Sequence, residues 1–193
     1  MAANNAGSIR FAPKGKILVA PIGTEAPEDV TTPWAAAWKE LGYVSPDGCE
    51  LTPSVDTQAV DVWQSAVPVK FVVNGAACTL KFTLLQFDAD ATALYFGTEW
   101  KAATKDDGTT IANTFILDLA STPNLAEKAL AVEWGDANST SRLVIPRGMI
   151  SEREGLKLTR TNSQSLGVTF EALDSAGRLG YILTNAAGIT AAA

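Results

Sequence analysis

The sequence predicts a mainly β protein, an antiparallel β-sandwich or flattened barrel with one or two short flanking α-helices. About ten stretches place apolar residues at every second position, which is the period of a strand with one buried face. Turn-forming sequences such as Pro46-Asp47-Gly48 separate these stretches. The chain has 193 residues, 47% of them apolar, which suits one well-filled core. We therefore expect a single domain over residues 1–193.

Both ends of the chain lack an apolar period. Residues from 1 to about 15 mix small, polar and glycine positions, so we expect a flexible N-terminal arm that orders only on contact with something else. The alanine-rich residues from about 186 to 193 predict a flexible C-terminal tail. The N-terminus does not resemble a secretory signal, and no run of about 18 apolar residues could span a bilayer.

Two short segments favour helix. The segment 32–42 has a capping threonine, a proline at the first helical position, three alanines and a closing glycine. Trp34, Trp38 and Leu41 would share one face of this helix and cover the apolar edge of a neighbouring sheet. A second helix is expected over residues 89–96, with an aspartate before it and a glycine after it.

Alternating segments account for most of the remaining chain. Asn74-Gly75 is a strong hairpin signal, so we expect it to turn the chain between strands at 67–73 and 77–87. The polar segment 100–113 is expected to be a surface loop. The other expected strands are 16–20, 59–62, 114–119, 129–134, 141–150, 156–160, 165–173 and 179–184.

The composition excludes several classes of function. A formal charge of −6 argues against a protein that holds nucleic acid by neutralising phosphates. The absence of histidine removes the usual general base and the commonest zinc ligand. Cys49 and Cys78 form no paired motif and are expected to be buried free thiols. We expect no catalytic residues, no cofactor and no metal site.

An enzyme acting through carboxylates is the alternative that the missing histidine leaves open. Asp106-Asp107-Gly108 is the acidic cluster that could attract a cation, but it lacks the pattern of a calcium-binding loop. We interpret it as part of a solvated loop.

Three segments together carry a resemblance to a known family. They are WKELGYVSPDGCELTPSVDTQAVDVWQSAVPVKFVVNGAACTLKF at 38–82, RLVIPRGMIS at 142–151 and GVTFEALDSAGRLGYILT at 167–184. In order and in character they resemble the major tail tube proteins of long, non-contractile-tailed bacteriophages. The resemblance covers about half of the chain, and no segment is a chemical motif with a unique role.

The resemblance implies a structural virion protein without enzymatic activity. Its subunits would form hexameric rings that stack into a tube, and the genomic DNA would pass through the bore without specific binding. The implied partners are other copies of the chain and the tape measure, tail tip and tail terminator proteins. The implied location is the virion tail, after assembly in the host cytoplasm and without contact with a membrane.

Two groups of residues are candidates for roles in such a tube. Asp56 and Asp61, with Glu50 behind them, could give the bore a negative surface that repels phosphate, although carboxylates on any outer face look the same. Trp34 and Trp38 could be anchors at the subunit interface, because tryptophan is favoured at buried contacts; filling of the core is the competing interpretation.

Other functions fit the same strands. The chain could be a tail terminator, a capsid decoration protein or a carbohydrate-binding β-sandwich. A terminator would stop at a single ring, whereas a tube protein would grow filaments.

Overall fold

The computed structural model describes residues 4, 8–119, 121, 126–136 and 138–189. The strands are β1 (Lys14–Pro21), β2 (Lys39–Glu40), β3 (Val44–Val60), β4 (Lys70–Leu84), β5 (Lys101–Thr104), β6 (Thr110–Ile116), β7 (Lys128–Gly135), β8 (Thr140–Arg153), β9 (Leu166–Ala172) and β10 (Tyr181–Thr184), and the helix is α1 (Ala89–Phe96). The predicted mainly β, antiparallel fold is confirmed. Its sheets are not closed into a barrel, and the arrangement is sandwich-like.

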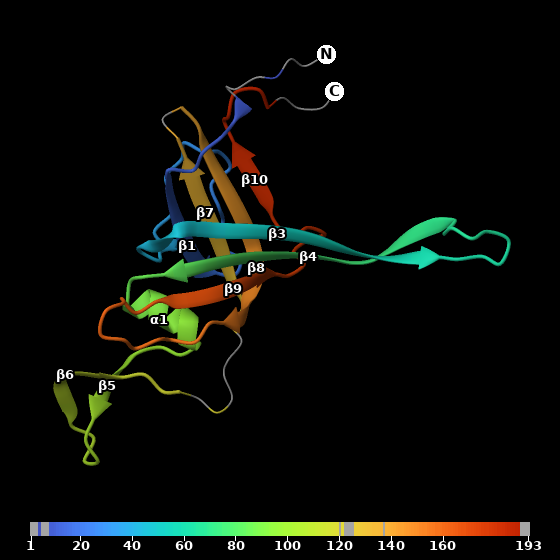
Figure 1. The fold of residues 1–193 in the computed structure, drawn as a ribbon. Helices are drawn as coiled ribbons and strands as arrows, with labels where there is room; N and C mark the ends of the chain where they lie inside the picture. The colour runs from blue at the N-terminus through green and yellow to red at the C-terminus, as the bar shows by residue number, and fades with distance from the viewer. Residues whose placement is uncertain (1–3, 5–7, 120, 122–125, 137, 190–193) are drawn as a thin grey trace.

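The strands form two layers that share β8. The hydrogen-bonded order is β2-β1-β7-β8-β9-β4-β3, and β10 also pairs with β8. β7 and β10 flank the first half of β8, whereas β9 pairs with its second half, from Gly148 to Arg153. A register shift against β7 near Pro146 bends β8 between its two halves. In Figure 1, β3, β4 and β9 accordingly run across β1, β7 and β10.

The main core lies between the layers. Its largest fully buried side chains come from both layers and include Phe170, Ile17, Leu80 and Ile145. α1 covers one end of this core with Leu94 and Tyr95. The predicted helix at 89–96 is confirmed with its caps, because Asp88 accepts a hydrogen bond from the Ala91 amide and Gly97 adopts φ +74°.

The prediction of a helix at residues 32–42 is wrong. This segment is extended and turned, and Lys39 and Glu40 within it form β2, which pairs with β1 at Leu18 and Val19. Leu41 enters the main core, whereas Trp38 belongs to a second cluster on the outer face of β1, β7 and β8. One helical face could not place these two side chains on opposite sides of a sheet.

Three further predictions fail in detail. Asn74-Gly75 is not a turn, because β4 continues through it and the chain turns at residues 61–69. The expected loop at 100–113 contains most of a separate antiparallel hairpin, β5–β6. No strand forms at 156–160.

A described residue near the start of the chain contacts one near its end. Arg10 donates a 2.7 Å hydrogen bond from its guanidinium to the carbonyl of Ala187. Residues 1–3, 5–7 and 190–193 of the expected arm and tail lie outside the described residues. In the described part of the chain, no helix is long and apolar enough to cross a membrane.

Candidate assembly interface

The hairpin of β3 and β4 extends far beyond the sandwich (Figure 1). β4 pairs with β9 only from Thr79 onward, so the outer parts of β3 and β4, from Val55 to Val60 and from Lys70 to Ala76, pair only with each other. Apart from the half-buried Ala59, every residue in these parts is exposed. An isolated two-stranded ribbon is marginally stable in water, so a contact outside the chain would stabilise this hairpin.

A bulge at Asn74 decides which side chains share a face of the hairpin. The register passes from Asp56 opposite Gly75 to Thr57 opposite Val73, so Asn74 has no partner of its own. Without this extra residue, Phe71 and Val73 would lie on the other face of the ribbon. With it, they share a face with Val55, which continues the core-facing side of β3 beyond Leu51.

This face is apolar and uncovered. Val55, Phe71 and Val73 are each more than 60% exposed. At the tip, the Ser65 amide and hydroxyl donate hydrogen bonds to the carbonyls of Val62 and Val67, and Trp63 is 99% exposed. We call this set of residues the hairpin apolar face: Val55, Trp63, Val67, Val69, Phe71 and Val73. Exposed apolar side chains gathered on one projecting hairpin are typical of sites of protein–protein interaction.

Over the sandwich, the opposite face of the same sheet is polar, whereas in the hairpin it also carries the exposed Val60 and Val72. One row across four strands reads Glu50, Lys81, Thr169 and Glu152, and the next reads Thr52, Thr79, Glu171 and Met149. These side chains are exposed or half-buried. Lys81 forms a 2.8 Å ion pair with Glu154, and this hydrogen bond and charge raise the pKa of Lys81. The row at Glu50 thus carries more carboxylates than cations.

The structure places the three predicted acidic residues along one strand and its turn. Glu50 and Asp56 are six residues apart in β3, so they share the polar face at a separation of roughly 20 Å. Asp61 lies beyond the end of β3, in the turn. Glu152 and Glu171, which share the face with Glu50, were missed because their strands are distant in sequence.

Trp34 and Trp38 pack against the outer face of β1, β7 and β8. Trp38 is 5% exposed and donates its indole hydrogen bond to the Glu25 carbonyl. Trp34 is half-buried, and the two rings contact each other with centroids 5.0 Å apart. The role of both residues as anchors at a subunit interface stays a prediction.

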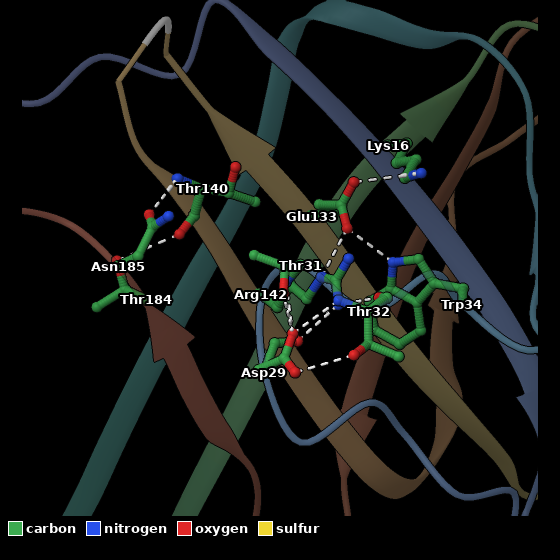
Figure 2. Close-up of polar contacts among 10 residues, drawn as sticks. All are labelled: Lys16, Asp29, Thr31, Thr32, Trp34, Glu133, Thr140, Arg142, Thr184 and Asn185. Carbon is green, nitrogen blue, oxygen red and sulfur yellow. Dashed lines mark hydrogen bonds and ion pairs between the residues drawn. The ribbon is translucent and has the colours of Figure 1, made fainter.

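Arg142 fixes the segment that carries these tryptophans (Figure 2). Its side chain is 5% exposed, and Nε lies 2.7 Å from Oε2 of Glu133. Nη1 donates to the carbonyls of Asp29 and Thr32 at 2.7 and 2.8 Å. The indole of Trp34 donates to the same Glu133 oxygen at 2.7 Å, so one carboxylate oxygen accepts two hydrogen bonds.

Two carboxylates beside Arg142 have lowered pKa values. The amides and hydroxyls of Thr31 and Thr32 donate to the Asp29 carboxylate, which holds its pKa far below the usual range. Burial alone would raise the pKa of Glu133, but the hydrogen bonds from Trp34, Arg142 and Lys16 lower it overall. Both groups are therefore charged at neutral pH. Sequence reasoning missed Arg142, since a single basic residue in a strand gives no signal of burial.

The remaining sequence candidates have structural explanations. Asp106-Asp107-Gly108 forms the turn between β5 and β6, where Gly108 has φ +82° and Asp107 accepts a hydrogen bond from the Thr109 amide. Cys49 is exposed and Cys78 is half-buried, and both are free thiols. The expectation that both thiols are buried is therefore wrong for Cys49, which lies in the exposed part of β3 directly after the bulge at residues 45–48.

A comparison with known protein families gives a match over nearly the whole chain. A family model described as "Phage tail tube protein" matches residues 1–192 of the 193. No curated protein matches the chain.

Proposed function

Because the chain belongs to the phage tail tube protein family, we propose that it forms hexameric rings that stack into the tail tube and let the genome pass. The family makes it a structural protein of the phage tail. The hairpin apolar face is the observation that carries the proposal. A subunit that acted alone would leave this face in water, whereas a subunit in a tube can bury it against another copy.

We propose that the hairpin contacts a neighbouring copy through its apolar face. The contact residues are exposed, large and apolar, and Trp63 is the largest of them. Buried tryptophans are frequent anchors of protein interfaces. Because the hairpin extends away from the sandwich, it can reach a neighbour without a change in the rest of the fold. Trp34 is a second proposed contact, with Trp38 behind it.

The polar face is the proposed lining of the bore. It carries Glu50 and Asp56 from the sequence prediction, with Asp61 at its outer end, and adds Glu152 and Glu171. Six copies around a ring would surround passing DNA with like charge, which opposes adhesion to its phosphates. The ends of the tube would meet the tape measure, tail tip and tail terminator proteins.

Electron microscopy of the purified chain at high concentration tests the proposal. Hollow filaments with sixfold rings are the expected result, either spontaneously or after addition of a tail tip complex. Single closed rings that never stack would indicate a terminator instead. A chain that stays monomeric with the tip complex present would refute the tube.

A further inference from the structure

β3 is a long strand at the edge of a sheet. It spans 17 residues and ends the strand order, so no strand in the described part of the chain pairs with its outer side. Unpaired edges of this length readily add strands from other chains and cause aggregation. A chain present in many copies during assembly therefore needs control over where its edge can pair.

The hydrogen bonding fixes which β3 residues face the free edge. The carbonyl of Val60 accepts from the Val69 amide at 3.0 Å, so the backbone of Val60 points toward β4. β3 pairs without an inserted residue of its own from Cys49 to Val60, since the extra residue at Asn74 belongs to β4. Backbone groups alternate along a strand, so Val60, Gln58 and Asp56 point inward and the odd-numbered residues point outward.

Pro53 is an outward-pointing residue. Proline has no N–H, so the free edge lacks a donor at this position. The next outward-pointing residues toward the start of β3 are Leu51 and Cys49. Beyond Cys49, the bulge at residues 45–48 interrupts the edge, and Gly48 there has φ +72°. The sandwich half of the edge thus offers two donors between two interruptions, whereas Val55, Thr57 and Ala59 offer three in succession.

Packing does not explain the proline. Pro53 is exposed, and its neighbour across the ladder is the half-buried Cys78. At an outward position it also costs no hydrogen bond to β4. What it changes is the pairing capacity of the edge.

We infer that Pro53 blocks strand addition by a second copy along the sandwich half of β3 and confines edge pairing to the hairpin half. The inference rests on the proposed function only in taking a second copy as the source of the added strand. Pro53 thereby prevents copies from joining through their sandwiches into sheets that lack a bore.

The test compares Pro53→Val with Thr57→Val. Both add a β-branched apolar side chain at an outward-pointing position of β3, but only the first restores an edge donor. One restored backbone hydrogen bond per added strand should strengthen pairing about fivefold. We expect Pro53→Val to form thioflavin-positive ribbons without a bore at about one fifth of the concentration that Thr57→Val needs. Thermal unfolding of the dilute proteins checks that both fold.

Equal aggregation thresholds for the two variants would overturn the inference. Pro53→Ala also restores the edge donor but adds no branched side chain. It replaces Pro53→Val in the test if that variant does not fold, and it should likewise aggregate at a lower concentration than Thr57→Val. If the wild-type chain forms no tubes, the proposed function is wrong, but the two aggregation thresholds still show whether Pro53 blocks strand addition. If tubes form and the two aggregation thresholds are equal, the inference about Pro53 is wrong and the proposed function stands.

Discussion

The guanidinium carbon of Arg142 lies 4.9 Å from the centroid of the Trp34 ring. Both side chains also bind the same carboxylate oxygen of Glu133. Residues about a hundred positions apart are thus held in one cluster, which attaches residues 29–34 to β7 and β8.

Trp34→Ala should leave a folded chain that assembles poorly. It removes the indole hydrogen bond and the contacts with Arg142 and Trp38, so the free energy of unfolding should fall by about 2 kcal/mol. Urea unfolding and filament counts by electron microscopy measure the two effects. Trp34→Phe keeps the ring without the N–H and should lose about 1 kcal/mol. A chain that assembles normally after Trp34→Ala would exclude Trp34 from the interface.

Arg142→Met should destabilise the chain strongly. It leaves the Glu133 carboxylate with Trp34 and Lys16 alone and leaves two carbonyls without a donor, at a cost of about 3 kcal/mol. Hydrogen exchange should rise first at residues 29–38. The matched control is Arg147→Met, which breaks the exposed pair with Glu127 and should cost less than about 1 kcal/mol. Equal losses in the two variants would contradict the role assigned to Arg142.

Trp63→Ser and Phe71→Ser should abolish assembly without unfolding the chain. Both side chains are exposed, so the free energy of unfolding should change by less than about 0.5 kcal/mol. Gln58→Ser, on the other face of the hairpin, is the control and should assemble as the wild type does. Sedimentation at a series of concentrations gives the readout. Filaments of normal length from both serine variants would show that the hairpin apolar face contacts no neighbour.

Asp56→Lys with Asp61→Lys should slow genome ejection while tubes still form. The reversed charges would attract phosphate within the bore instead of repelling it. Ejection from phage particles triggered in vitro is the measurement, and lowering the ionic strength should enlarge the delay because screening weakens. The control reverses Asp106 and Asp107 in the β5–β6 turn. Normal ejection by the first variant would place these residues away from the bore.

Acid should weaken the chain through Asp29 and Glu133. Both carboxyls have lowered pKa values when folded, so their contribution to stability is complete above the unfolded pKa of about 4 and is lost as the pH falls toward the lower folded values. Urea midpoints at pH 7, 4 and 3 measure the loss. Asp29→Asn should reduce stability at pH 7 and flatten the dependence on pH. An unchanged slope would mean that Asp29 keeps its ordinary pKa.

Strand alternation predicted most of the sandwich because burial of one face leaves a period of two. It located β1, β7, β8, β9 and β10 nearly to their ends. It failed where tertiary contacts override local signals. Residues 32–42 have the composition of a helix. Trp38, however, packs in the cluster on the outer face of β1, and Leu41 packs in the main core on the other face.

The candidate site was harder to predict than the fold. Asn74-Gly75 has the composition of a turn, but pairing along the whole of β3 makes it a bulge instead. The alternating apolar residues on both sides of Asn74-Gly75 could have indicated a hairpin that is too long to fit within one sandwich. The polar face was only partly predictable, because Glu152 and Glu171 reach Glu50 through pairing of strands about a hundred residues apart.

β8 takes part in both layers, which has a mechanical consequence. A pull on the projecting ribbon enters the subunit through β3 and β4, passes across hydrogen bonds to β9, and arrives at β8. Because β8 is one continuous strand, its covalent backbone carries the load from the half that pairs with β9 to the half that pairs with β7 and β10. The layers therefore cannot slide apart under tension unless β8 itself leaves the sheet.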